Sequence, residues 1–291
     1  MDQCGLRRLA ATATRPVTTS AEFGRTSPQY TSAVPRRVAL ITGPTSGIGE
    51  GFARRYAADG YDVVLVSRDA DRLTELAVEL SDEGGREVEV LPADLAEPAG
   101  RGNVAERLAA GVDVLVNNAG FGTSGEFWTA DPAVLQAQLE VNVAAVMQLT
   151  RAALPAMIDA GAGTVLNVAS VAGLLSGRGS TYSASKAWVV SFTEGLAVGL
   201  RGTGVGIHVV CPGYVHTQFH DRAGIDMTSL PSFMWLEVDD VVRESLADIA
   251  RGRVVIVPGV QYKAITSASR MVPRTLARAA TSVFGRGRGR T

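Results

Sequence analysis

Short runs of apolar residues alternate along the chain with longer segments whose apolar positions follow helical spacing. Most of the apolar runs are continuous and rich in valine, which is typical of parallel strands buried on both faces. They predict seven strands, at 37–42, 61–67, 87–91, 112–117, 163–170, 206–212 and 253–258. The intervening segments predict helices at about 48–59, 70–84, 98–110, 131–160, 181–202 and 238–251.

This alternation of strands and helices predicts an α/β fold with a Rossmann-type doubly wound sheet of about seven parallel strands. No repeat of fixed period and no internal linker divides the core, so we expect a single domain over 36–269. The first 35 residues are rich in Thr, Ser, Ala, Arg and Pro without periodicity. We interpret 1–35 as a disordered leader, or as the result of a start codon placed too early, in preference to a targeting segment.

The C-terminal segment 270–291 differs from the rest because it contains six arginines and no acidic residue. After Pro273 its pattern predicts a short basic amphipathic helix followed by a flexible tail. Such a helix could attach to a membrane surface. We favour the simpler interpretation, in which it covers its own domain or a subunit contact.

Composition narrows the classes of partner. The formal net charge of −1 provides no field that would attract nucleic acid. The two cysteines, Cys4 and Cys211, are far apart and have no metal-ligand spacing, so we expect neither a disulfide framework nor a metal site. No run of 18 or more apolar residues occurs, so we expect no membrane-spanning helix. The low cysteine content fits a reducing, cytoplasmic setting.

A glycine-spaced stretch follows the first strand and precedes a helix. Gly43, Gly47 and Gly49 would permit a tight turn and a close approach of a pyrophosphate to the helix N-terminus. The spacing is wider than the usual G-x-G-x-x-G, and Pro44 has no backbone N–H to donate. The amides from Ser46 to Gly49 remain available, so we still predict a dinucleotide site.

The end of the second strand bears on which dinucleotide binds. There an acidic side chain would bind a ribose 2′-hydroxyl, whereas a basic one accepts a 2′-phosphate. The sequence has Ser67, Arg68 and Asp69 at this point. Arg68 favours NADP(H), with NAD(H) left open, and Asp69 is suited to cap the next helix. The alternative is that Arg68 is an ordinary exposed charge.

Reactive side chains gather where later strands end. Tyr182 and Lys186 are four residues apart, so they share one face of a helix. A close ammonium favours the phenolate, which lets a tyrosine exchange a proton with a ketone oxygen. Ser170 ends the fifth strand, and Asn142 lies in an apolar helical stretch where it must find polar partners.

Seven motifs in this order resemble the short-chain dehydrogenase/reductase family over about 36–260. They are "TGPTSGIG" (42–49), "ADL" (93–95), "NNAG" (117–120), Asn142, Ser170, "YSASK" (182–186) and "PGYVHT" (212–217). Within the family the chain is most similar to bacterial NADP-dependent ketoreductase-type members. The resemblance implies a catalytic domain over 36–269 that assembles as a homodimer or homotetramer.

The resemblance also implies roles for individual residues. Tyr182 would be the general acid/base, Lys186 would lower its pKa and hold the nicotinamide ribose, and Ser170 would polarise the substrate oxygen. Asn142 would position a water molecule for proton relay. Cofactor contacts are implied at Gly43, Thr45, Ser46, Gly47, Ile48, Gly49, Arg68, Asp94, Leu95, Asn117, Ala119, Gly120, Tyr182, Lys186, Pro212, Val215 and Thr217.

We therefore expect an oxidoreductase that transfers hydride between NADP(H) and a secondary alcohol/ketone pair. An apolar cluster after Thr217 suggests a lipophilic substrate, such as an acyl or steroid-like ketone; it comprises Phe219, Ile225, Met227, Leu230, Phe233, Met234 and Trp235. The same cluster could instead pack against the core or a neighbouring subunit. His216 and His220 flank it and are expected to face solvent.

Two other functions stay open at this point. One is a catalytically silent nucleotide-binding or scaffold protein of the same fold, which the presence of both Tyr182 and Lys186 disfavours. The other is an epimerase or dehydratase acting on a nucleotide sugar. That function would normally need a larger C-terminal domain than the roughly 75 residues that follow Pro212.

Overall fold

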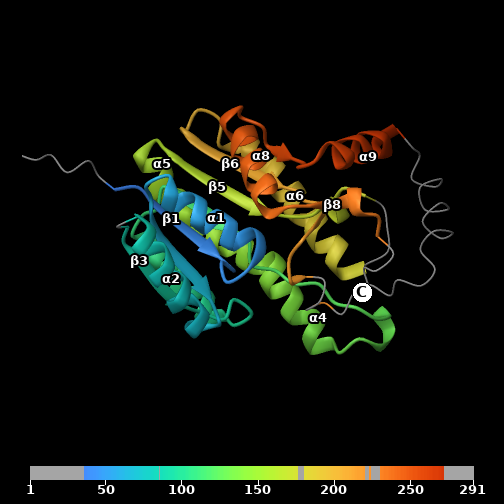
Figure 1. Cartoon of the computed structure of the whole chain (residues 1–291), viewed down its shortest axis with the longest axis horizontal. Coiled ribbons are helices and arrows are strands. Elements are labelled where there is room, and N and C mark those ends of the chain that lie inside the picture. The colour runs from blue at the N-terminus through green and yellow to red at the C-terminus, as the bar shows by residue number, and fades with distance from the viewer. Residues whose placement is uncertain (1–35, 85, 176–179, 220–222, 224–229, 272–291) are drawn as a thin grey trace, which may run out of the picture. The chain divides into compact units, whose positions relative to one another are not determined.

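A central parallel sheet organises the part of the chain that the computed structural model describes, which is 36–84, 86–175, 180–219, 223 and 230–271 (Figure 1). Its seven strands follow the order β3-β2-β1-β4-β5-β6-β9, and every pairing is parallel. In that order the bounds are Val88–Pro92, Asp62–Ser67, Val38–Thr42, Val114–Asn117, Gly163–Val168, Val205–Val210 and Val255–Ile256. The seven predicted strands and the Rossmann-type fold are thereby confirmed.

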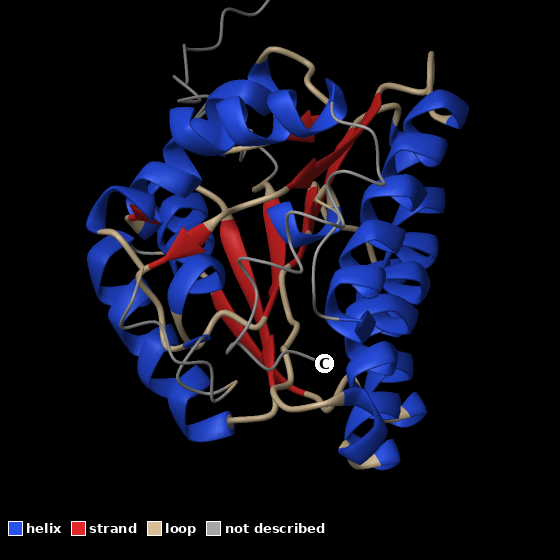
Figure 2. Ribbon diagram, turned by 90° about the vertical axis from the view of Figure 1, so that its right-hand side faces the viewer, coloured by secondary structure: helices blue, strands red, loops and turns tan. Residues whose placement is uncertain are grey.

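Helices cover both faces of the sheet (Figure 2). One face packs against α1, α2 and α8, and the other against α3, α5 and α6. The bounds are α1 Gly47–Ala58, α2 Ala70–Gly84, α3 Pro98–Ala109, α4 Pro132–Leu139, α5 Val146–Ala160, α6 Ser180–Gly199, α8 Val238–Ala250 and α9 Val260–Met271. This double cover explains why the strands are continuously apolar.

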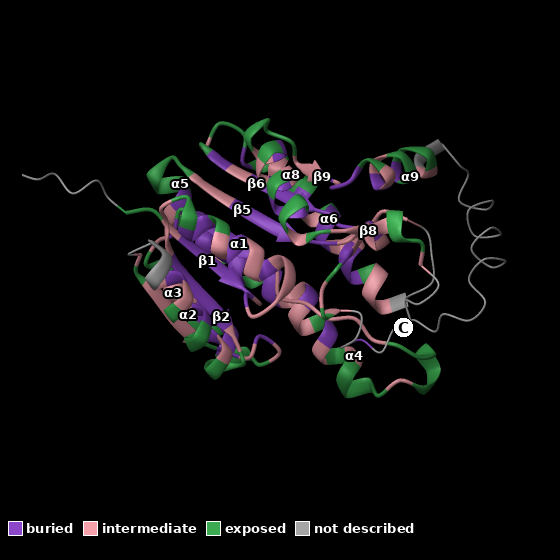
Figure 3. Cartoon of the chain, in the orientation of Figure 1, coloured by how far each residue is buried: buried purple, intermediate pink, exposed green. Residues whose placement is uncertain are grey.

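Strand β1 shows how a strand is buried on both faces of the sheet. Ala39 and Ile41 join the core under α1, whereas Leu40 between them joins the core under α3 and α5. All three side chains are fully buried, because successive residues of a strand point to opposite faces and here both faces are covered (Figure 3).

The predicted helix 131–160 is one continuous helical run with an irregular middle. It consists of α4, a π-helical turn η2 (Glu140–Ala145) and α5. Pro132–Ala160 is long and apolar enough to cross a membrane by length and composition, but 44% of its apolar window is buried inside the fold. Leu149, Ala153 and Met157 pack into the core, which accounts for its apolar character.

The C-terminal part contains elements that the sequence patterns did not predict. Helix α9 begins at Val260, and a two-stranded parallel sheet pairs β7 (Tyr214–Val215) with β8 (Trp235–Leu236). Short 3-10 turns add η1 (Phe127–Thr129), η3 (Val171–Gly173) and η4 (Ser232–Met234). The predicted leader 1–35 and the predicted basic helix after Pro273 lie outside the described residues.

The strand order sets the position of the site. Strand β1 has β2 on one side and β4 on the other, so the connections leaving these strands diverge at the carboxyl edge of the sheet. In open α/β sheets such a switch point leaves a crevice in which ligands bind. The loops after β1, β4, β5 and β6 therefore converge on one place.

Candidate active site

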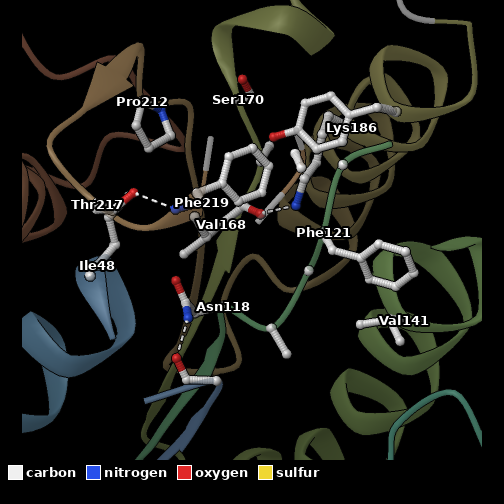
Figure 4. Close-up of a pocket in the computed structure, with 18 of the residues that line it drawn as sticks. Ile48, Asn118, Phe121, Val141, Val168, Ser170, Lys186, Pro212, Thr217 and Phe219 are labelled. Carbon is white, nitrogen blue, oxygen red and sulfur yellow. Dashed lines mark hydrogen bonds between the residues drawn. The ribbon is translucent and has the colours of Figure 1, made fainter. Parts of the chain in front are cut away.

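A large cavity lies at this carboxyl edge of the sheet (Figure 4). Its volume is about 1270 Å³, and it extends from the glycine loop and the end of β2 to the start of α6 and to α9. The predicted site residues that line it are Gly43, Thr45, Ser46, Gly47, Ile48, Arg68, Asp94, Leu95, Ala119, Gly120, Ser170, Tyr182, Lys186, Pro212, Val215 and Thr217. The fold thus brings together groups that are up to 174 positions apart in sequence.

The backbone of the glycine loop lies very close to neighbouring segments of the chain. Gly43 and Gly47 adopt left-handed φ angles of 66° and 61°, which favour glycine. A Cβ at Gly47 would lie 2.7 Å from Cγ2 of Thr217. Any larger residue would therefore push the loop away from the segment that follows β6.

Gly49 is a predicted contact that does not line the cavity. A Cβ there would lie 2.2 Å from the Gly43 carbonyl oxygen and 2.3 Å from Nδ2 of Asn118. This glycine is needed because helix α1 is pressed against the loop and the end of β4. Its role is to seat the helix whose N-terminus faces the cavity.

The start of α1 is suited to an anion despite Pro44. The helix begins at Gly47 with Ser46 in extended conformation before it. The N–H groups of a helix's first turn have no partner within the helix, and the helix dipole favours negative charge at that end. Pro44 precedes this turn. The loop therefore fits the pyrophosphate of a dinucleotide.

At the end of β4 the structure separates two neighbouring asparagines. Asn117 is buried, and its amide donates to Oγ1 of Thr150 at 3.1 Å and to Oδ1 of Asn167 at 2.9 Å, so it contacts the core and not the cavity. Asn118 lines the cavity and donates to the carbonyl oxygens of Thr42 and Gly43, at 3.0 and 2.9 Å. Strand alternation within "NNAG" is the signal that could have identified Asn118.

Lys186 is a buried amine beside Tyr182. The residue is 4% exposed, and its Nζ donates to the carbonyl oxygen of Val168 at 2.8 Å. Nζ lies 5.9 Å from the centre of the Tyr182 ring, which confirms that the two residues share one helical face. Burial lowers the pKa of Lys186 to about 8. A Cβ on Gly120 would come within 3.2 Å of this nitrogen.

Ser170 joins this group from the end of β5. It lines the cavity, and its Oγ accepts the backbone N–H of Ala172 at 3.1 Å, which caps η3. The short helix lies directly on α6, because a Cβ on Gly173 would be 2.6 Å from the Lys186 carbonyl carbon. The cap thus places the Ser170 hydroxyl on the same wall as Tyr182 and Lys186.

Asn142 acts on the site from outside the cavity wall. It is 0% exposed and sits in the π-helical turn η2, a distortion that often marks functional positions. Its Oδ1 accepts the N–H of Phe121 at 3.1 Å, and its Nδ2 donates to the Phe121 carbonyl at 3.1 Å and to Ser185 Oγ at 3.2 Å. Ser185 Oγ donates in turn to the Tyr182 carbonyl at 2.7 Å. A polar chain therefore joins Asn142 to the start of α6.

Arg68 lies at the opposite end of the cavity. Its side chain is 76% exposed, and its Nη1 is 3.8 Å from Oδ2 of Asp94. Oδ1 of Asp69 accepts the N–H of Arg72 at 3.0 Å, so Asp69 caps α2 as the sequence predicted. The carboxylate of Asp69, which follows Arg68 in the sequence, thus caps α2, and the Arg68 guanidinium lines the cavity with the distant Asp94 as its ion-pair partner.

Apolar side chains surround the end of the cavity near Tyr182. The Phe219 and Tyr182 rings lie 5.7 Å apart between centres, and other apolar lining residues are Phe121, Val141, Leu175, Met234 and Ile265. Of the predicted apolar cluster, Phe219 and Met234 face the cavity, whereas Phe233 is exposed. Ile225, Met227 and His220 lie outside the described residues.

Trp235 does not line the cavity, although the sequence placed it in the apolar cluster. Its ring stacks on that of His216 with centres 4.5 Å apart, and Nε2 of His216 lies 3.7 Å from Oε1 of Glu237. The His216 side chain is 53% exposed, so the prediction that it faces solvent is confirmed. Phe121, Val141 and Ile265 were missed as lining residues, because no sequence spacing links them to the motifs.

Comparison with known proteins agrees with this geometry. Residues 37–227 match the family described as short chain dehydrogenase. Ketoacyl reductase HetN of Nostoc sp. is 37% identical over 183 residues, a match that covers 62% of this chain but 63% of that protein, which is less than two thirds of its length.

Two solved structures are similar over most of their length. A short-chain dehydrogenase from Sphingobium yanoikuyae in complex with NADPH shares 36% identity, with a TM-score of 0.75, over 80% of this chain and 93% of that one. A short chain dehydrogenase/reductase from Burkholderia phymatum in complex with NAD shares 30% identity, with a TM-score of 0.70, over 80% and 92%.

The chain therefore belongs to the short-chain dehydrogenase/reductase family, as the motifs indicated. The family, the relative and the neighbours together support an NAD(P)-dependent oxidoreductase that acts on alcohol and carbonyl groups. The glycine loop with its facing helix N-terminus fits the nicotinamide dinucleotide that this class uses.

The buried Lys186 predicts a pH-dependent stability in the cofactor-free protein. The pKa of Lys186 is about 8 in the folded protein and 10.5 in an unfolded chain. At pH 7 the ammonium is therefore charged in both states, and burying it lowers the stability of the fold by roughly 3 kcal/mol. Because the folded state releases this proton first, its contribution to stability increases as the pH rises through this window. Lys186→Met should be more stable than the wild type at pH 7, and the difference should shrink by pH 9.5.

The measurement is urea unfolding of both proteins at the two pH values. The comparison between wild type and variant cancels the titration of all other groups. The lost hydrogen bond to Val168 would offset about 1 kcal/mol of the gain. A stability difference that stays constant between pH 7 and pH 9.5 would contradict the argument.

Proposed function

We propose that this protein transfers hydride between NADP(H) and a secondary alcohol/ketone pair with a lipophilic substrate. One observation carries the proposal: Tyr182 lines a large cavity directly beside the buried Lys186, with Ser170 on the same wall. A phenol that can give up a proton next to a hydride acceptor is what carbonyl reduction needs.

The chemistry divides between the cofactor and the chain. The nicotinamide group supplies or accepts the hydride when it is bound. In the reductive direction Tyr182 donates its hydroxyl proton to the ketone oxygen, and the Lys186 ammonium stabilises the phenolate that remains. Ser170 donates a hydrogen bond to the same oxygen and orients the carbonyl. Asn142 fixes Phe121 and positions a water molecule that returns the proton.

Cofactor contacts follow the cavity from one end to the other. The amides at the start of α1 would hold the pyrophosphate, and Asp94 and Leu95 would flank the adenine. Thr217, which lies against Gly47, would hold the nicotinamide amide. Asn118 supports this arrangement by fixing the Gly43 carbonyl. Asn117, for which the resemblance implied a cofactor contact, instead bonds to Thr150 and Asn167 in the core.

Replacing Tyr182 by Phe tests the mechanism. Removal of the acid should lower kcat by roughly 10²- to 10⁴-fold while the Kd for NADPH stays nearly unchanged. Turnover is followed at the nicotinamide absorbance, and cofactor binding by fluorescence titration. Tyr61→Phe is the control, since that hydroxyl accepts from Arg37 at 2.9 Å and does not line the cavity. Undiminished turnover in Tyr182→Phe would refute the mechanism, and a wild type that binds NADPH but never turns over would favour the silent-scaffold alternative.

NADP(H) is preferred in this proposal because of Arg68. The exposed Arg68–Asp94 pair at 3.8 Å is weak, as exposed pairs contribute about 0–1 kcal/mol. A 2′-phosphate offers more charge and several acceptor oxygens, so it would displace Asp94 as the partner of the guanidinium. The S. yanoikuyae neighbour, which binds NADPH, supports this choice, whereas the B. phymatum neighbour binds NAD.

Arg68→Ala should raise the Kd for NADPH by about tenfold or more and leave the Kd for NADH nearly unchanged, since hydrogen bonds to charged groups contribute about 1.5–3 kcal/mol. Arg72→Ala is the matched control, because Arg72 pairs with Glu75 and Glu79 and does not line the cavity. Isothermal titration with NADPH and NADH gives the Kd of each variant relative to the wild type for both cofactors. A wild type that prefers NADH would exclude the proposed role of Arg68.

The lipophilic substrate follows from the wall near Tyr182. Phe219, Met234 and Ile265 come from three separate segments and all line this end of the cavity. The similarity to a protein named ketoacyl reductase supports an acyl ketone. Apolar lining of this extent stabilises a bound chain by about 0.8 kcal/mol per buried methylene.

A series of 3-ketoacyl thioesters of increasing chain length tests the substrate class. The ratio kcat/KM should rise by up to about fourfold for each added methylene until the apolar end is filled. Phe219→Ala should flatten this dependence without changing the Kd for NADPH. Short hydrophilic ketones serve as the comparison, and equal kcat/KM values along the series would exclude the lipophilic assignment.

The cytoplasmic location and the homodimer or homotetramer stay predictions. Several exposed apolar side chains on the outer surface of α4, α5 and α6 are compatible with an assembly. Peripheral membrane contact through the basic C-terminal segment stays the less favoured interpretation, and that segment lies outside the described residues.

A further inference from the structure

A buried arginine on α3 connects two parts of the site that are otherwise separate. Arg101 has a side chain that is only 6% exposed, although α3 contributes no residue to the cavity wall. Its guanidinium reaches past the helix toward the loop after β3 and toward the π-helical turn. Neither the sequence motifs nor the proposed function gives it a role.

On one side Arg101 holds the loop that forms the adenine end of the cavity. Its Nη1 donates to the carbonyl oxygens of Leu95 and Ala96, both at 2.9 Å, and both residues line the cavity. The helix is pressed onto this loop, because a Cβ on Gly100 would lie 2.1 Å from the Asp94 carbonyl oxygen. The path of the loop at the cavity therefore depends on Arg101.

On the other side Arg101 holds the turn that carries Asn142. Its Nη2 lies 3.0 Å from Oε2 of Glu140, the first residue of η2, and its Nε donates to Oε1 of Gln148 at 2.9 Å. Glu140 also accepts from Gln136 at 2.7 Å, so its carboxylate is fixed from two directions. The guanidinium thus pairs with the first residue of the π-helical turn on its α3 side. Within the same turn, Asn142 bonds to the backbone of Phe121.

The energetics favour a positioning role over simple stabilisation. Removing a guanidinium from water is expensive, and apolar residues of the same volume often stabilise a core equally well. What the planar guanidinium adds is direction, since its N–H donors fix the relative placement of several acceptors. Here those acceptors belong to the adenine wall and to the Asn142 turn.

We propose that Arg101 is a positioning residue that couples the adenine side of the cofactor cavity to the turn that carries Asn142. The inference rests on the proposed function, which gives Leu95 to the adenine and Asn142 to the proton path. Binding of the cofactor at one end then favours the catalytic arrangement of Phe121 at the other, and the coupling is reciprocal.

Three variants separate the two contacts. Arg101→Met removes both, Glu140→Ala removes only the contact to the turn, and Arg107→Met is the control. Arg107 lies on the same helix and pairs with Glu89 at 2.7 Å, away from the cavity. Three quantities are measured for each variant: the Kd for NADPH, kcat at saturating cofactor and ketone, and hydrogen exchange of the Phe121 amide without cofactor.

Arg101→Met should weaken NADPH binding, lower kcat and speed exchange at Phe121, each by about tenfold, the size expected for hydrogen bonds to a charged group. Glu140→Ala should lower kcat and speed exchange by similar factors, and because the coupling is reciprocal it should weaken NADPH binding too, but by less than Arg101→Met does. Arg107→Met should change none of the three. The exchange of the Phe121 amide reports the Asn142 contact directly, because that amide donates to Oδ1 of Asn142.

Two results would overturn the proposal. One is an Arg101→Met variant whose melting temperature falls while Kd, kcat and Phe121 exchange stay at wild-type values, which indicates a merely structural role. The other is a Kd effect without any change in kcat or exchange, which shows that the two ends are not coupled. If Arg101→Met does not fold, Arg101→Lys should shift the same quantities in the same direction by smaller factors.

Failure of the proposed oxidoreductase function can be distinguished from failure of the Arg101 coupling. A wild type that binds NADPH but transfers no hydride to any ketone would refute the function. The Kd and Phe121 exchange would still decide the coupling, because neither measurement depends on turnover.

Discussion

The buried ammonium of Lys186 is the constraint on which the site depends. It lies at the carboxyl edge of the parallel sheet, where its Nζ donates a hydrogen bond to the carbonyl oxygen of Val168 at the end of β5. The rest of its surroundings must leave it room, and Gly120 does so by having no side chain. A charge held this way destabilises the fold and gives Tyr182 a cation that water does not screen.

Several buried polar side chains hold the backbone around this charge. Asn142 pairs with both the N–H and the carbonyl of Phe121, and Gln138 adds a bond to Thr123 in the same loop, at 3.2 Å. Ser185 carries the contact to the carbonyl of Tyr182. Because each of these groups would be costly if unpaired, the loop after β4 and the start of α6 have one well-defined arrangement.

The sequence predicted the strands well because burial on both faces leaves an unmistakable pattern. It predicted the glycine loop, "NNAG" and Ser170 because each follows a strand, and parallel strands end at one edge. It predicted Tyr182 and Lys186 from their spacing on one helical face. It gave the cavity contact to Asn117 where the structure places Asn118, since a motif does not say which of two neighbours faces the ligand. It did not find Arg101, whose partners at Leu95 and Glu140 are linked only by tertiary packing.

The two ends of the cavity come largely from different parts of the chain, which under the proposed function separates the choice of cofactor from the choice of substrate. The glycine loop, Arg68 and Leu95 all precede β4, whereas Phe219, Met234 and Ile265 all follow β6.

Tyr262 on α9 holds the substrate end together. Its hydroxyl accepts the N–H of Tyr214 at 2.9 Å and donates to the carbonyl of Met234 at 2.5 Å, while its ring occupies the space that a side chain on Gly213 would need. These two hydrogen bonds hold β7 beside β8, and they fix the backbone of Met234 in the apolar wall of the cavity. Under the proposed function, side chains on that wall can therefore change with the substrate while Tyr182 and Lys186, which lie on α6 beside the sheet, keep the same roles.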